Sequence, residues 1–193
     1  MAIILASGST RRKELLQYSA ITIKAVCPAN IVEKRNPHEA PLEYCSRLAR
    51  EKAEALDIKG EWILAADTIV AVENDVFEKP ESIEHAIEIL EGLSGGWHQV
   101  ISAWTLRYAP QTGEKECIRS GYSISDVRFR NLERREIEAY VSSGESMDKA
   151  GAYGIQGIGA CLVAEIKGSY SNIVGLPLEE VLEAIREEVE HVN

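Results

Sequence analysis

The chain has 193 residues, of which 45% are hydrophobic and 27% are charged, and these values exclude a disordered or low-complexity protein. Its length suits a single domain covering residues 1–193, which can consist of two lobes. The 31 acidic and 21 basic residues give a formal net charge of −10, which argues against general binding of DNA or RNA because the phosphate backbone would be repelled. A single phosphate-bearing molecule can still bind where basic side chains gather locally.

The apolar N-terminal segment 1–6 is short, and basic residues follow it, which is the wrong order for a signal peptide. Apolar runs stay well below the roughly 20 residues of a transmembrane helix. The four cysteines form no Cys-x-x-Cys pair, so we do not expect a thiolate zinc site, and a reducing compartment fits. We therefore expect a soluble, cytosolic protein that does not bind a membrane.

The first part of the chain predicts strands and helices from apolar runs that end at turn or capping residues. In chain order these are a strand at 3–6, a helix from 11 capped by Ser9 or Thr10, a strand at 21–26, a proline-rich loop at 28–41, a helix at 41–56, a strand at 62–72 and a turn at 73–75.

The second part continues with a helix capped by Ser82, and with further alternating or β-branched strand patterns. In chain order we expect a helix at 82–93, a strand at 99–108, a hairpin turn at 110–113, one or two strands at 117–129, a helix at 133–141, a glycine-rich structured loop at 147–159, a strand at 160–166 and a helix at 178–192. Because strands and helices mix without a strict βαβ repeat, we predict an α/β fold with a twisted mixed sheet, flanking helices and a cleft.

The segment Ser7–Arg12 has the composition of an anion site. Its small residues allow the backbone to approach an anion, and the following helix start offers N–H groups and a positive dipole end. The planar guanidinium groups of Arg11 and Arg12 suit phosphate. The pattern also fits an ordinary capped helix with two solvated arginines, and the spacing of a Walker loop is absent.

Asp67 interrupts the apolar strand at 62–72, and we expect it at the end of a buried strand. A carboxylate there is costly unless it is paired, hydrogen-bonded or bound to a metal. It could hold Mg²⁺ or accept a proton from an attacking water, and a structural aspartate is the alternative.

Other candidates are weaker when viewed singly. Glu33 in the proline-rich loop, Lys52 on a helix, Lys79 before a proline and His98 after two glycines each fit ordinary surface or loop positions. The run Asp148–Gly157 is an ordered glycine loop or a place of close ligand approach, where the carboxamide of Gln156 could read a base edge.

Together these segments resemble the Maf family of nucleotide pyrophosphatases. The resemblance covers nearly the whole chain in order, through residues 5–16, 51–53, 66–68, 78–80, 93–95, 98, 148–157, 168–170 and 175–177. It implies two lobes around a central cleft in a Maf/inosine-triphosphatase-like fold. It also implies hydrolysis of a nucleoside triphosphate to monophosphate and pyrophosphate, a divalent metal cation (Mg²⁺ or Mn²⁺) and a homodimer.

The resemblance implies roles for individual residues, by position in this sequence. Asp67 would be the catalytic acidic residue, with Glu33 assisting, and both would hold the metal. Phosphate binding would fall to Ser7, Ser9, Arg11, Arg12, Lys52 and Lys79. Substrate choice would fall to Arg11, Thr68 and Gln156.

Thr68 and Gln156 resemble the branch that hydrolyses dTTP and UTP, whereas a sister branch acting on 7-methyl-GTP has Gln after the aspartate and Glu at the position of Gln156. Departures from the family pattern, such as Thr10 where Pro is usual, remove none of the proposed catalytic groups. The alternatives are the 7-methyl-GTP activity and a nucleotide-binding regulator of cell division or septum formation.

Overall fold

The protein is described here by a computed structural model that covers residues 1–112 and 115–192. Among these residues, seven strands form one mixed sheet in the order β2-β1-β3-β5-β6-β7, with β4 paired to β3. β1 is parallel to β2 and β3, while β4 is antiparallel to β3 and β7 is antiparallel to β6. The strands are β1 (Ala2–Leu5), β2 (Thr22–Val26), β3 (Trp62–Val72), β4 (Asp75–Phe77), β5 (Trp97–Tyr108), β6 (Cys117–Phe129) and β7 (Val163–Lys167).

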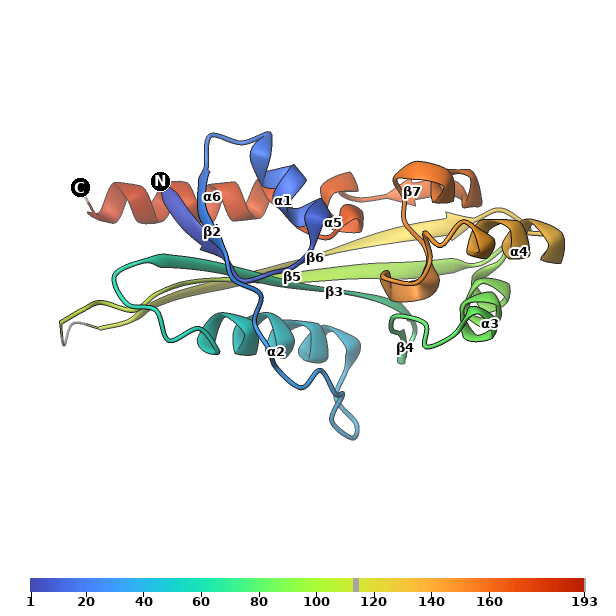
Figure 1. The fold of residues 1–193 in the computed structure, drawn as a ribbon, viewed down its shortest axis with the longest axis horizontal. Helices are drawn as coiled ribbons and strands as arrows, with labels where there is room; N and C mark the ends of the chain where they lie inside the picture. Colours follow the sequence, from blue (N-terminus) through green and yellow to red (C-terminus); the bar gives the residue numbers. More distant parts are fainter. Residues whose placement is uncertain (113–114, 193) are drawn as a thin grey trace. The chain divides into compact units, whose positions relative to one another are not determined.

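The helices flank this sheet, which confirms the predicted α/β fold with a mixed sheet and flanking helices (Figure 1). Within residues 1–112 and 115–192, no helix combines the length and the apolar composition that crossing a membrane requires. The helices are α1 (Thr10–Gln17), α2 (Pro41–Glu54), α3 (Ile83–Leu93), α4 (Arg134–Ser142), α5 (Tyr170–Val174) and α6 (Leu178–Val192), with 3₁₀ turns η1 (Ala150–Ala152) and η2 (Gly157–Leu162).

The chain packs as two compact units. Unit 1 contains the described parts of Met1–Asp67, Ser102–Ser123 and Gly175–Asn193, and unit 2 contains Thr68–Ile101 and Ile124–Val174. The long strands β3, β5 and β6 each contribute residues to both units.

Unit 1 is built around β1 and the first half of β3. Apolar side chains of these strands and of Ala6, which follows β1, form a core cluster with Ala53 of α2. The cluster consists of Ile4, Ala6, Ala53, Ile63 and Ala65. Within this unit, α2 and α6 lie on opposite sides of the sheet (Figure 1). The buried face of α2 follows helical spacing through Cys45, Leu48, Ala49 and Lys52, so a lysine continues an otherwise apolar stripe.

Unit 2 holds α3 and α4, which pack against each other through their apolar faces. The buried side of α3 is formed by Ala86, Ile87, Ile89, Leu90 and Leu93. Ser82 caps α3 by accepting a hydrogen bond from the backbone N–H of His85, as its position in the sequence predicts.

Some boundaries differ from those expected. The strand predicted at 160–166 begins only at Val163, because residues 157–162 close into the η2 turn. Segment 117–129 is one strand, and the short elements β4 and α5 were not predicted. The last residue of the hairpin turn expected at 110–113 lies outside the described residues.

Two glycines differ in the space that is available for an added side chain. An added Cβ at Gly121 on β6 would come within 2.7–2.9 Å of three indole atoms of Trp104, whereas one at Gly92 on α3 would meet nothing within 4 Å. We expect Gly121→Ala to destabilise the protein by about 1–3 kcal/mol through overpacking. Gly92→Ala should stabilise it by about 0.5–1 kcal/mol because alanine favours the helix. Urea unfolding of both variants checks the pair, and equal midpoints would contradict it.

Candidate active site

The loop after β1 places two serines at the start of α1. Ser9 is the N-cap of α1, because its Oγ accepts a hydrogen bond from the backbone N–H of Arg12 at 3.4 Å. The backbone N–H of Ser9 donates to Ser7 Oγ at 3.3 Å. The loop therefore lies at the carboxyl end of a parallel strand and the amino end of a helix, which is where α/β proteins bind anions.

Arg12 holds this loop in place through two side-chain hydrogen bonds. Its Nη1 donates to Ser7 Oγ at 2.9 Å, and its Nε donates to the backbone carbonyl of Gly175 at 2.8 Å. Burial lowers the pKa of the Arg12 guanidinium, and the nearby Asp67 carboxylate opposes this by raising the pKa. Arg12 thus links the serine loop electrostatically to the aspartate of β3.

Lys52 brings together two of the predicted carboxylates. Its Nζ donates to Asp67 Oδ1 at 2.6 Å and forms an ion pair with Glu33 Oε1 at 2.9 Å. Lys52 is 8% exposed and Asp67 is 6% exposed, so this pair is buried. Because a buried charge without a partner costs several kcal/mol, each of these two side chains depends on the other.

Asp67 lies inside β3 rather than at its end, so the expected position at a strand end is wrong. Buried apolar residues both precede and follow it, because β3 passes from unit 1 into unit 2. Glu33 reaches the same lysine from the proline-rich loop, and its side chain is 44% exposed. Three separate segments therefore meet at Lys52.

Cys45 lies on the same face of α2 as Lys52, and its side chain is fully buried. Burial raises the pKa of its thiol, and the Asp67 carboxylate raises it further. A protonated thiol in this position packs as a small apolar side chain instead of acting as a nucleophile.

The other predicted residues of the site lie in unit 2, apart from Arg11, which belongs to unit 1 as the second residue of α1. Thr68 follows Asp67 on β3, and Lys79 is exposed between β4 and α3. Gln156 is partly exposed and directly precedes η2. The backbone N–H of Gly151 donates to the carbonyl of Glu78 at 3.3 Å, which joins the segment of Lys79 to the loop of Gln156.

His98 is buried in an aromatic cluster of unit 2. Its Nε2 lies 2.7 Å from the Tyr153 hydroxyl, and its ring meets Phe129 edge-on at 4.8 Å between centroids. Burial lowers the pKa of His98 from 6.5 to about 4, so the ring is neutral in the folded protein at pH 7. These contacts give His98 a packing role in the core of unit 2.

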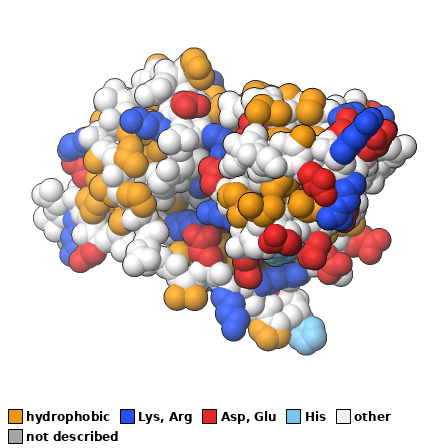
Figure 2. Space-filling model, turned by 45° about the vertical axis from the view of Figure 1, so that its right-hand side comes forward, with side chains coloured by type: hydrophobic (Ala, Val, Ile, Leu, Met, Phe, Trp, Pro, Cys, Tyr) orange, Lys and Arg blue, Asp and Glu red, His pale blue; other side chains and the backbone are white. Residues whose placement is uncertain are grey.

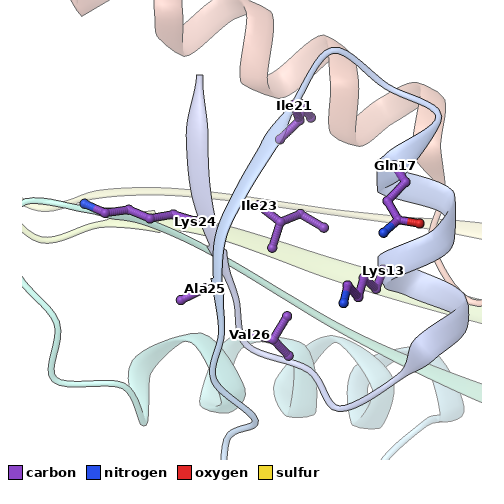
Figure 3. A pocket seen from close by; sticks show the side chains of 7 residues that line it. All are labelled: Lys13, Gln17, Ile21, Ile23, Lys24, Ala25 and Val26. Carbon is purple, nitrogen blue, oxygen red and sulfur yellow. The ribbon is translucent and has the colours of Figure 1, made fainter.

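A separate hollow of about 370 Å³ lies between α1 and β2 (Figure 3). Its lining contains none of the predicted site residues and consists of Lys13, Gln17, Ile21, Ile23, Lys24, Ala25 and Val26. Lys24 is paired with Glu61. The charged cluster around Lys52 is therefore the stronger candidate site in unit 1.

Comparison with known proteins agrees with the order of the family motifs along the chain. The family model described as Maf-like protein matches residues 2–188. The chain belongs to the Maf-like family. Maf-like relatives named dTTP/UTP pyrophosphatase occur in Escherichia coli O157:H7 and Salmonella typhimurium, each 46% identical, with 95% of this chain and 91% of each relative covered. The relative of the same name from Escherichia coli K12 is 44% identical with the same coverage.

Among solved structures, a HAM1 protein from Coxiella burnetii matches with a TM-score of 0.46 and 17% identity. The match covers 97% of this Maf-like chain and 99% of that one.

The buried pair predicts unequal effects of single and double substitutions. Lys52→Met leaves Asp67 buried beside an apolar side chain, so we expect a loss of about 3–5 kcal/mol in the free energy of unfolding at pH 7. Adding Asp67→Asn removes the uncompensated charge, so the double variant should lose less than the sum of the two singles. Urea unfolding measures all three variants, with exposed Lys13→Met as the control. Additive losses would show that the two charges do not depend on each other.

His98 predicts an acid-sensitive step in stability. Its folded pKa of about 4 lies below its unfolded value of 6.5, so the unfolded chain binds the extra proton first as the pH falls. Stability should therefore fall between pH 6.5 and pH 4, by about 3 kcal/mol from this residue. Urea unfolding at several pH values should give a shallower decline for His98→Gln. The same slope in both proteins would contradict the assignment.

Proposed function

We propose that this Maf-like protein hydrolyses dTTP and UTP, and modified pyrimidine nucleoside triphosphates, to nucleoside monophosphate and pyrophosphate. The observation that carries the proposal is the meeting of Glu33, Lys52 and Asp67 in unit 1, electrostatically linked through Arg12 to the serine loop. The names of relatives at 44–46% identity over 95% of the chain support the same reaction.

Phosphate binding follows from the chemistry of the loop before α1. The serine hydroxyls and the N–H groups at the start of α1 suit phosphate oxygens, and the positive end of the helix dipole adds to this. We assign Ser7, Ser9, Arg11, Arg12, Lys52 and Lys79 to this role. Their positive charges stabilise the negative charge that develops on the leaving pyrophosphate, so an acidic protein can still bind a triphosphate.

Asp67 serves as the proton acceptor in this scheme. The oxygen of an attacking water forms a bond to phosphorus while the phosphoanhydride bond between the α and β phosphates breaks. The electron pair of the broken bond goes to the leaving phosphate oxygen, and the water proton goes to the Asp67 carboxylate. The hydrogen bond from Lys52 Nζ to Asp67 Oδ1, at 2.6 Å, fixes the position of the carboxylate that accepts the proton.

Glu33 and Asp67 also fit a divalent metal. Both carboxylates lie within bonding distance of the same Lys52 Nζ, and Mg²⁺ is bound by one or two carboxylates together with waters and phosphate oxygens. Within the described residues, no cluster of three or more His, Cys, Asp or Glu side chains could hold a metal ion alone, which fits a site completed by the substrate. When bound, Mg²⁺ or Mn²⁺ would neutralise phosphate charge.

Substrate choice is assigned to Arg11, Thr68 and Gln156. Thr68 and Gln156 favour pyrimidines over 7-methylguanine, in agreement with the names of the relatives.

The four cysteines are present as thiols, which supports a cytoplasmic location. On the face drawn in Figure 2, Lys and Arg lie among Asp and Glu and form no continuous basic surface, which fits a small nucleotide better than a nucleic acid. From the family resemblance we also propose a homodimer.

The reaction is tested by product analysis. With Mg²⁺ and a panel of triphosphates, we expect dTTP and UTP to give monophosphate and pyrophosphate, and 7-methyl-GTP to react more slowly. Asp67→Asn should lower kcat by about 100-fold to 10,000-fold, because it removes the proton acceptor while keeping the shape of the side chain. A chelator should also abolish turnover.

Other products would change the conclusion. Diphosphate and free phosphate would place the cleavage between the β and γ phosphates instead. Binding of nucleotides without turnover would favour the nucleotide-binding regulator. Exposed Glu54→Gln on α2, which removes a surface carboxylate paired with Arg50, serves as the matched control.

A further inference from the structure

The loop that carries Gln156 is held by a carboxylate from a neighbouring segment. Glu145 Oε2 accepts a hydrogen bond from the backbone N–H of Ile158 at 3.0 Å, and its Oε1 accepts one from the N–H of Gly159 at 3.1 Å. These are among the first N–H groups of the η2 turn, which have no partner inside the turn. Hydrogen bonds to an ionised acceptor are the stronger kind, so Glu145 fixes the backbone that follows Gln156.

Tyr140 fixes the backbone on the other side. The N–H of Gly154 donates to the Tyr140 hydroxyl at 3.2 Å, and this hydroxyl donates to Glu145 Oε1 at 3.1 Å. Tyr140 is 3% exposed on α4, and burial raises the pKa of its hydroxyl, which therefore keeps its proton to donate. Gln156 lies between two anchored points of backbone.

The glycines of this loop leave little room for movement. Gly157 has a φ of 66°, and an added Cβ would come within 2.6 Å of Glu145 Oε2. At Gly159 an added Cβ would come within 2.1 Å of the carbonyl oxygen of Gly154. The backbone is thus packed tightly against the two side chains, while the Gln156 side chain is partly exposed.

We propose that Glu145, together with Tyr140, is a positioning residue that fixes the backbone on both sides of Gln156 and thereby sets the pyrimidine preference of the enzyme. A carboxamide discriminates between bases only when its oxygen and its NH₂ group are presented in one orientation. A loop that moves by about 1 Å would present both groups poorly, and selectivity would fall. The proposal rests on the proposed role of Gln156 in reading the base.

The test separates the loop anchor from its effect on selectivity. Glu145→Gln keeps the side-chain shape but directs an NH₂ group at a backbone N–H. We expect hydrogen exchange at Gly154, Ile158 and Gly159 to speed up by about 10-fold to 100-fold, as expected for a lost hydrogen bond to a charged acceptor. Glu138→Gln on α4 is the matched control, since Glu138 is exposed and paired with Arg134.

Selectivity is measured as the ratio of binding affinities for the α,β-methylene analogues of UTP and GTP, by calorimetry on the full chain. We expect Glu145→Gln to lower this ratio by about tenfold, because uniform binding of the base is weakened. For UTP hydrolysis, KM should rise while kcat changes by less than about twofold. In a Gln156→Ala background, Glu145→Gln should cause no further loss of selectivity.

Three outcomes would overturn the proposal. The first is faster hydrogen exchange in Glu145→Gln with an unchanged affinity ratio. The second is an equal loss of selectivity on Glu145→Gln in the wild-type and the Gln156→Ala backgrounds. The third is an affinity ratio in Gln156→Ala that equals that of the wild type. If Glu145→Gln does not fold, Tyr140→Phe removes the anchor at Gly154 and tests the same ratio. Because the analogues are not hydrolysed, this ratio is measured independently of turnover, and wild-type hydrolysis of UTP reports separately on the proposed function.

Discussion

The buried ion pair between Lys52 and Asp67 is the constraint on which the organisation of unit 1 depends. It ties the inner face of α2 to β3, and it gives the Asp67 carboxylate a charged partner within a strand whose neighbours are apolar. The same ammonium group holds Glu33 and so fixes part of a long loop. Since a charge left alone here is costly, folding depends on the same lysine side chain that we propose to bind phosphate.

In unit 2, hydrogen bonds to the backbone, instead of an ion pair, hold the Gln156 loop in place. Its Gln156 loop has little regular structure, and its backbone donors are satisfied by Glu145 and Tyr140. In unit 1 a carboxylate is paired with a lysine, whereas in unit 2 a carboxylate is paired with backbone N–H groups. In both places the carboxylate orders a segment whose position hydrophobic burial alone would not determine.

Local sequence patterns predict the long elements well because burial repeats along them. The limits of β3 and α6 agree with the apolar runs, and Ser9 caps α1 as its side-chain chemistry suggests. The position of Asp67 inside β3 was mispredicted, because two adjacent polar residues, Asp67 and Thr68, within an apolar run resemble the end of a strand. Lys52 and Glu33 look ordinary singly since their partners are distant in sequence, and only the family resemblance pointed to them. Glu145 follows Ser-Gly in a loop and carries no local signal at all.

The anchoring of the Gln156 loop through its backbone has a consequence for how such an enzyme can change in evolution. Glu145 and Tyr140 contact main-chain atoms on both sides of position 156 and do not require a particular side chain there. A substitution at this position can therefore alter the presented group while the loop keeps its shape. The residues that hold the loop are thus distinct from the side chain that we propose to contact the base. Under this proposal, a single substitution at position 156 changes the base preference without a cost to folding.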